Sequence, residues 1–198
     1  MATQLQLRRG TTAQHSTFTG LEGELTYDTD LKHPVIHDGV TAGGLEVKTY
    51  GGAVYFYAYR TANQNILTST ATKIQFNNAR QDSSNSFDTA TNFRFTVPTG
   101  QAGDYFFQLQ MTAYSASANI TYVYPTFLLN GVTRYGNYAR APGAAISYIT
   151  EHASVVLSLS DGDFVEANAF IVGTSPILLG GDSAGGFEQT HMTGFKLN

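Results

Sequence analysis

Apolar and polar residues alternate along much of the chain, most clearly between Phe87 and Ala113. Phe93, Phe95 and Val97 alternate with polar neighbours, which is typical of a strand with one apolar face and one wet face. A proline and two glycines follow at residues 98–103 and indicate a loop. The stretch therefore predicts a strand, a turn and a second strand.

The second strand of this stretch contains one residue that breaks the alternation. Its apolar positions are Tyr105, Phe107, Leu109 and Met111. Phe106 lies among the polar positions between them, which places a large ring on the otherwise polar face. An apolar ring there is typical of a second contact surface, so we expect this face to be buried in an oligomer.

Residues 5–44 contain short strand patterns and few large apolar side chains. Leu5 and Leu7 start one strand pattern, and two more follow. The segment from Thr11 to Gln14 has the form of a capping box, which predicts a short helix. About forty residues of this composition are too few to bury a stable core alone. The unit should therefore need a neighbour, either two further copies of itself or a partner protein.

Three motifs in this first unit resemble a short module found near the N-termini of bacteriophage tail fibres and related virion appendages. They are RRGT at residues 8–11, GELTYDTD at 23–30 and HDGVTAGG at 37–44. The resemblance implies a small trimeric β unit that joins a fibre to the particle or to the next fibre section. It therefore predicts contacts with other virion proteins through residues 1–48.

The glycine-rich segment 41–52 predicts a link between two domains, residues 1–48 and residues 49–198. The second domain contains about ten strand patterns, with turn signals at the spacing typical of a β-sandwich. Its final strand-like segment, HMTGFKLN, is expected to lie centrally in one sheet.

Four motifs in the second domain resemble the complement globular-head and tumour necrosis factor superfamily. They are AVYFYAYR from residue 53, FDTATNFRFTVPTG from residue 87, LSLSDGDFV from residue 157 and MTGFKL from residue 192. The resemblance implies a jelly-roll sandwich that assembles as a compact homotrimer. The predicted fold class is all-β: a small N-terminal β module followed by a ten-stranded jelly-roll head similar to tumour necrosis factor.

Aromatic residues supply two candidate surfaces in the head. The residues predicted for the trimer interface are Tyr55, Tyr57, Phe106 and Phe170. The residues predicted to bind a ligand or receptor are Tyr122, Tyr124, Arg134, Tyr135, Tyr138 and Arg140. Tyrosine offers a flat apolar face and a hydroxyl to a sugar or protein, and arginine adds bidentate contacts to carboxylate or phosphate. The alternative is that these tyrosines pack in the core or the trimer interface.

Composition excludes several function classes. The net charge is −4, so no positive field attracts nucleic acid. The chain has no cysteine, which excludes disulfides, a thiol catalyst and a thiolate metal site. The N-terminus lacks the apolar core of a signal peptide, and no apolar run is long enough to span a bilayer. We expect neither secretion by the usual route nor membrane insertion.

The candidate metal ligands favour structural roles. Asp161 and Asp163 flank a glycine, and a tight turn is favoured over calcium because the other oxygen ligands are lacking. His33 and His37 are four residues apart, but the sequence between them predicts a strand and not the helix of a zinc pair. The other three histidines stand alone, although a trimer would bring three copies of one of them to its axis. We expect no metal and no cofactor.

The chain also lacks the short motifs of common hydrolases and nucleotide-binding sites. The sequence therefore favours a non-enzymatic virion protein, most simply a trimeric tail-fibre tip that binds a glycan or protein on the host cell. The main alternative is a fibre or cement protein that decorates the capsid or baseplate. The hypothesis of an enzyme that cleaves glycans is less favoured.

Overall fold

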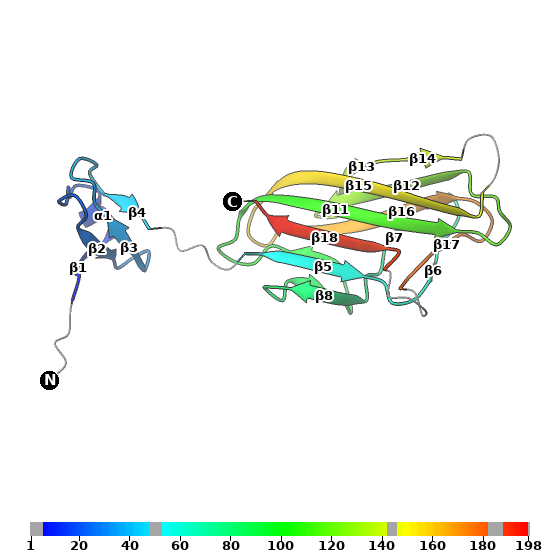
Figure 1. Ribbon diagram of the computed structural model, residues 1–198, viewed down its shortest axis with the longest axis horizontal. Coiled ribbons are helices and arrows are strands. Elements are labelled where there is room, and N and C mark those ends of the chain that lie inside the picture. Colours follow the sequence, from blue (N-terminus) through cyan, green and yellow to red (C-terminus); the bar gives the residue numbers. More distant parts are fainter. Residues whose placement is uncertain (1–5, 48–52, 142–145, 182–187, 198) are drawn as a thin grey trace. The chain divides into compact units, whose positions relative to one another are not determined.

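The computed structural model describes residues 6–47, 53–141, 146–181 and 188–197. The chain divides into two compact units, Met1–Gly51 and Gly52–Asn198. Figure 1 shows a small N-terminal unit and a larger sandwich of long strands. Each unit is described by itself below.

The N-terminal unit is one small sheet with a single helical turn. Its strands lie in the order β1-β2-β3-β4, with β1 parallel to β2 and the other pairs antiparallel. The bounds are β1 (Arg8–Gly10), α1 (Thr12–His15), β2 (Leu25–Asp28), β3 (His33–Ile36) and β4 (Leu45–Glu46). The predicted capping box is confirmed, because the Gln14 backbone N–H donates to Thr11 Oγ1 and the Thr11 backbone N–H donates to Gln14 Oε1.

The second unit is a sandwich of two sheets. One sheet has the order β13-β12-β16-β10-β9, with β14 beside β12 and β7 beside β16. The other has the order β6-β17-β11-β18-β5-β8, with β15 beside β11. The bounds are β5 (Tyr55–Tyr59), β6 (Gln64–Asn65), β7 (Thr72–Lys73), β8 (Asn78–Asp82), β9 (Phe87–Asp88), β10 (Arg94–Thr96), β11 (Gly103–Tyr114), β12 (Tyr122–Leu129), β13 (Val132–Gly136), β14 (Ala139–Arg140), β15 (Tyr148–Leu159), β16 (Phe164–Val172), β17 (Ile177–Leu178) and β18 (His191–Lys196).

The two sheets enclose an aromatic core, and the alternation along β11 is confirmed. Tyr105, Phe107, Leu109 and Met111 are fully buried. The Phe107 ring centroid lies 5.8 Å from that of Phe95 and 6.2 Å from that of Phe127, so β10, β11 and β12 share one cluster of rings across the two sheets. Such tilted ring pairs add to the burial energy of each side chain.

The expected central position of the last strand is also confirmed, since β18 lies between β11 and β5. The strands outnumber the ten predicted because several of them are only two residues long. Phe93 differs from its prediction: its φ is +52°, so it lies in the left-handed region just before β10 and does not extend the strand.

The first strand of the head begins at the same end of the sandwich at which the last strand ends. Tyr55, at the start of β5, pairs with Phe195 near the end of β18. Strand β11 begins beside this end and runs the length of the sheet to Tyr114, and β12 starts from the opposite end at Tyr122. The chain therefore enters the head at one end, while the Ser115–Thr121 connection lies at the other, as Figure 1 shows.

Candidate functional site

Aromatic side chains cover one region of the sheet that contains β12 and β16. Tyr122 pairs with Arg140 on one side and with Val172 on the other, so these three residues form a row across the sheet. Tyr124 pairs with Phe170 in the next row. Directly paired residues point to the same side of a sheet, and the buried Val123 points to the core. These rows therefore lie on the outer side of the sandwich.

Tyr122 is the centre of this outer cluster. The Tyr138 ring stacks on it at 5.6 Å between centroids, and the Phe170 ring meets it edge-on at 6.0 Å. The Arg140 guanidinium lies 5.7 Å from the centroid of the same ring. We call the six residues of this cluster the Tyr122 surface: Arg140, Tyr122, Val172, Tyr138, Tyr124 and Phe170. A cavity of about 470 Å³ opens beside it, lined by Thr121, Tyr122, Arg140, Ala141 and Val172.

The structure brings together four of the six residues predicted for ligand binding. Tyr122, Tyr124, Tyr138 and Arg140 belong to the Tyr122 surface. Tyr135 pairs with Phe127, a fully buried core residue, so it points to the opposite side of its sheet from Tyr124. Arg134 lies beside it on β13, where the register of the β12 pairing shifts.

The four residues predicted for the trimer interface do not share one surface. Phe170 lies in the Tyr122 surface, whereas Tyr55, Tyr57 and Phe106 lie on the other sheet. The sequence could not show this difference, because alternation reveals the two faces of a strand and not the sheet to which the strand belongs.

On that other sheet, four neighbouring strands each contribute one apolar side chain to a single row. Val156 pairs with Phe106, Phe106 with Phe195, and Phe195 with Tyr55. We call these four residues the Phe106 row. Phe106 is half-buried against Phe195, at 5.3 Å between ring centroids, and the other three side chains are exposed. The sequence prediction found Phe106 and Tyr55 but missed Val156 and Phe195, which only the strand register places beside them.

Histidines lie further along this face. His191 stacks on Tyr57 at 5.0 Å between ring centroids, so it does not stand alone. Burial lowers the pKa of His191 and raises the pKa of Tyr57. Gln110 pairs with both His191 and His152, so the two histidines flank β11 on the same side.

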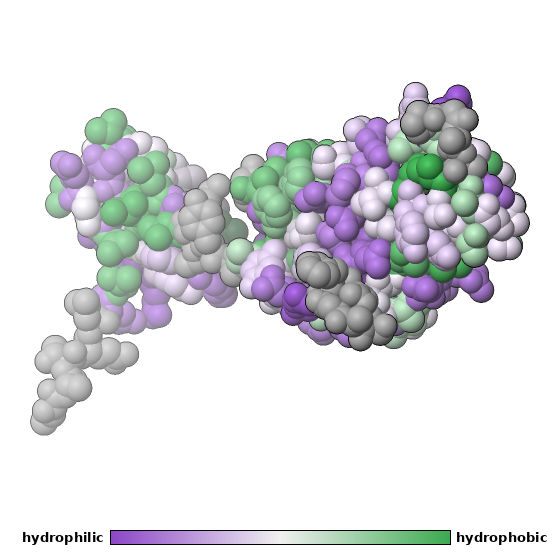
Figure 2. Space-filling view, turned by 45° about the vertical axis from the view of Figure 1, so that its right-hand side comes forward, coloured by the Kyte–Doolittle hydropathy of each residue, from purple (hydrophilic) through white to green (hydrophobic). Residues whose placement is uncertain are grey.

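The N-terminal unit also carries an apolar row. Leu25 pairs with Ile36, and Ile36 pairs with Leu45. Leu7 precedes Arg8, which is aligned with Thr26, and so lies beside Leu25 on β2. We call these four residues the Leu25 row. All four are exposed, with exposed fractions between 40% for Ile36 and 50% for Leu45. Figure 2 shows apolar residues gathered at the surface of this small unit.

The other side of this sheet contains two buried histidines joined by a hydroxyl. Thr26 Oγ1 lies 2.9 Å from His15 Nε2 and 2.9 Å from His37 Nε2. His15 Nδ1 is 3.0 Å from the Thr11 carbonyl, which only accepts, so this nitrogen carries the His15 proton. His37 Nδ1 accepts from the Gly20 backbone N–H at 3.3 Å, so its Nε2 carries the proton.

These assignments give one consistent chain of hydrogen bonds through the Thr26 hydroxyl. His37 Nε2–H donates to Thr26, and Thr26 donates to His15 Nε2. Glycine is required at position 20, because a Cβ there would lie 2.5 Å from His37 Cγ. His15 therefore does not stand alone, and His37 has the structural role that we predicted for it.

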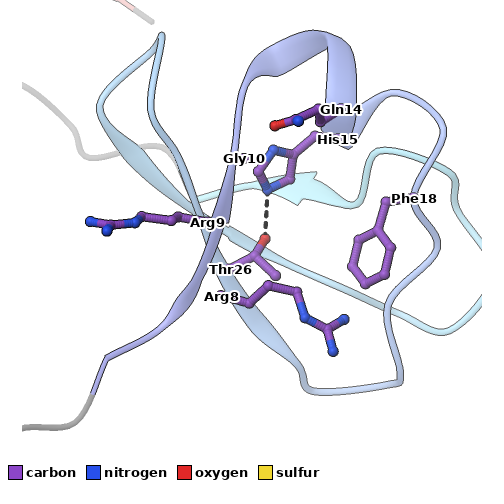
Figure 3. A pocket seen from close by; sticks show the side chains of 7 residues that line it. All are labelled: Arg8, Arg9, Gly10, Gln14, His15, Phe18 and Thr26. Atoms are coloured by element: carbon purple, nitrogen blue, oxygen red, sulfur yellow. Dashed lines mark hydrogen bonds between the residues drawn. The ribbon is translucent and has the colours of Figure 1, made fainter.

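A pocket of about 260 Å³ opens beside His15 (Figure 3). Arg8 lies at its edge, with Nη1 2.9 Å from Glu24 Oε1 and the guanidinium 5.0 Å from the Phe18 ring centroid. Figure 3 shows that Arg9 points away from the other labelled side chains. The Arg8 guanidinium at this pocket thus already has a carboxylate partner.

The acidic turn predicted near residue 162 is confirmed. Asp161 accepts hydrogen bonds from the backbone N–H groups of Gly100, Gln101 and Ala102. These bonds, that of Gly100 first, lower the pKa of Asp161. The carboxylate therefore fastens the β10–β11 loop. Within the described ranges, no group of three or more histidine or acidic side chains is arranged to hold a metal ion.

The comparisons concern the two units separately. Residues 5–41 match the family model described as the major tropism determinant N-terminal domain. Over 44 residues, the chain is 61% identical to the tail fiber receptor-binding protein of Bordetella phage BPP-1. That match covers 22% of this chain and 12% of the phage protein.

The head is similar in fold to solved structures of complement and tumour necrosis factor relatives. The match to the globular domain of zebrafish complement 1qA protein covers 73% of this chain and 98% of that domain, at 15% identity and a TM-score of 0.53. The match to murine APRIL covers 73% of this chain and 99% of the APRIL chain, at 13% identity and a TM-score of 0.53. The match to Eiger TNF from S. frugiperda covers 74% of this chain and 93% of the Eiger chain, at 8% identity and a TM-score of 0.54.

Both resemblances noted in the sequence are thus confirmed. Within the described part of the chain, no helix has the length and apolar character needed to cross a membrane. The protein joins an N-terminal unit similar to the major tropism determinant N-terminal domain to a head with the jelly-roll fold of the complement and tumour necrosis factor domains.

Proposed function

We propose that this chain is a subunit of a bacteriophage tail fibre whose head binds the surface of the host cell. The observation that supports this most strongly is the 61% identity of its first unit to a tail fiber receptor-binding protein. The proposed role is non-enzymatic. Residues 1–48 attach the chain to other virion proteins, and residues 49–198 project as the binding head, so the protein is located on the virion.

The fibre is a homotrimer in this proposal. Both units expose an apolar row on one sheet face, the Leu25 row and the Phe106 row. Each row crosses three or four strands, so it presents a continuous apolar band, unlike the scattered apolar residues of an ordinary surface. Packing three copies of a unit together would remove its band from water, and the complement and tumour necrosis factor superfamily that the head resembles implies a trimer.

A trimer would also suit a receptor-binding role. Three heads carry three copies of any site, and a surface of many identical receptors can engage them together. Individually weak contacts then give firm attachment. The receptor in this proposal is a glycan or protein of the host surface.

Antibodies against residues 53–198 would test the proposal. On intact particles, gold-labelled antibody should mark the tail, and unlabelled antibody should reduce adsorption to host cells. Gold on the capsid or baseplate, with normal adsorption, would instead support the alternative of a decorating protein. Release of reducing ends from host polysaccharide by the purified chain would contradict the non-enzymatic role.

A further inference from the structure

We propose that the Tyr122 surface binds a sugar ring that carries a carboxylate. This inference rests on the proposed function, because it names the chemical class of receptor that the head recognises. Three properties of the surface support it: a preformed aromatic platform, an arginine that forms no ion pair within the described part of the chain, and a cavity beside both.

The platform is held in place by contacts between its own rings. Tyr138 is 60% exposed, yet its ring stacks on Tyr122 with an angle of 26° between the planes. Phe170 supports Tyr122 from the side, with ring planes at 84°. A ring that is exposed but already positioned loses little conformational freedom when a ligand covers it. The flat C–H face of a sugar fits such a ring, and tyrosine hydroxyls can bond the sugar hydroxyls.

The charge comes from Arg140, which lies in the same row as Tyr122. Lys73 and Arg80 of the head form ion pairs with Glu166 and Glu188. Arg140 is in none of the ion pairs found within the described ranges. A guanidinium presents a planar pair of donors that matches the two oxygens of a carboxylate. In this proposal the carboxylate of the ligand is the anionic partner of Arg140.

The cavity gives the ligand a place beside these groups. Its volume, about 470 Å³, is within the range of small-molecule sites. Tyr122 and Arg140 line one part of it, and the methyl-bearing side chains of Thr121, Ala141 and Val172 line the rest. A ring stacked against this wall can therefore direct its carboxylate to Arg140.

The position of the surface also suits a receptor. Tyr122 is the first residue of β12, at the end of the head opposite Tyr55, where the chain enters. A net charge of −4 argues against a nucleic acid as the anionic ligand. A neutral glycan would leave Arg140 unused, so the carboxylated class fits the observed side chains better.

Titration of the full chain with trigalacturonic acid and trimeric sialic acid, followed by NMR or calorimetry, tests the inference. At least one probe should bind saturably. Arg140→Gln should weaken that binding about ten-fold, the loss expected for a partly exposed charge-assisted contact. Arg134→Gln is the matched control, because its side chain belongs to the neighbouring strand outside the cluster, and it should change affinity less than two-fold, roughly the scatter of such surface changes.

Tyr138→Ala and Tyr135→Ala form the second matched pair. We expect only Tyr138→Ala to lose binding, since Tyr135 points to the other side of its sheet. Methyl-esterified trigalacturonate should bind weakly and should be insensitive to Arg140→Gln. The inference is overturned if neither acid binds, if the ester binds equally well, or if Arg134→Gln weakens binding as much as Arg140→Gln. It is also overturned if Tyr138→Ala lowers the assembly mass, because the surface would then be an intersubunit contact.

Adsorption to host cells separates this inference from the proposed function. If the chain coats host cells and the Tyr138 and Arg140 variants coat them equally well, the inference fails and the proposed function stands. If the chain binds the acidic probe as expected but does not coat host cells, the site is real and the proposed function fails.

Discussion

At the scale of single residues, the buried threonine of the N-terminal unit shows how a small fold depends on one hydroxyl. Thr26 donates to His15 and accepts from His37, and all three side chains are buried. A sequence alone shows three unremarkable polar residues, because their meeting requires the pairing of β2 with β3 and the placement of α1. The Nδ1 contacts with Thr11 and Gly20 set the two tautomers, and the Thr26 hydroxyl gives both Nε2 atoms a partner.

Thr26→Val keeps the side-chain shape and removes the hydroxyl. Two buried ring nitrogens then lose their partner, so we expect the N-terminal unit to lose about 2–4 kcal/mol of its free energy of unfolding. Amide hydrogen exchange of residues 25–36 in the full chain would measure the loss. Thr17→Val is the control, because Thr17 is exposed. Equal protection in the two variants would contradict the role given to Thr26.

Asp161 gives a pH dependence whose sign follows from its hydrogen bonds. Its pKa is lowered in the folded state, chiefly by the Gly100 N–H. Its contribution to stability is therefore present above the unfolded pKa of about 3.9 and is lost as the pH falls through the folded value. Asp161→Asn should reduce the difference in melting temperature between pH 7 and pH 3. Glu151→Gln, which alters a carboxylate bonded to the Asn137 side chain, is the control. An unchanged difference in the Asp161 variant would show that the loop does not depend on this charge.

At the scale of elements, β11 was the most predictable part of the fold. Its alternation between residues 105 and 111 correctly separated core from surface, because it is a long strand with one face against the other sheet. Several neighbours were not predictable in the same way. The two-residue strands have no pattern to detect, and alternation does not reveal the left-handed φ of Phe93.

The candidate site was also predictable only in part. Residue type indicated Tyr122, Tyr138 and Arg140, which the structure brings together. Pattern gave no reason to separate Tyr135 from them, because the register between β12 and β13 shifts at Phe127 and Leu128, and the sequence does not show that shift. Phe170 could not be assigned to a sheet for a similar reason. Sequence can thus predict the two faces of a regular strand such as β11, but not the face of a residue beside a register shift or the sheet to which a strand belongs.

Phe106 and Phe107 allow the two faces of β11 to be compared directly. Phe107→Ala removes a fully buried ring, so the free energy of unfolding of the head should fall by about 3–5 kcal/mol. Phe106→Ala removes a half-buried ring from the outer row and should cost the isolated head about 1 kcal/mol or less. Chemical denaturation of residues 53–198 at low protein concentration measures both. Equal losses would mean that the alternation has been assigned to the wrong faces.

At the scale of the whole molecule, assembly is the property on which the proposed function depends. The mass of the assembly in solution should be three times the 21.4 kDa of one chain by light scattering. Phe106→Glu places a charge in the Phe106 row, and burying that charge without a partner is costly. We expect the variant to shift toward smaller species while its circular dichroism stays unchanged. A wild-type chain that remains monomeric at high concentration would contradict the proposed trimer.

The meeting of β5 and β18 at one end of the sandwich has a practical consequence. Tyr55 begins β5 shortly after the boundary between the two units, so one peptide segment near residue 52 connects the head to the first unit. An exchange of the sandwich for a relative of the same strand order would therefore use that segment as its N-terminal junction. A virus could change the cells it recognises by recombination at this one point, and an engineer could build a library of interchangeable tips on one stem.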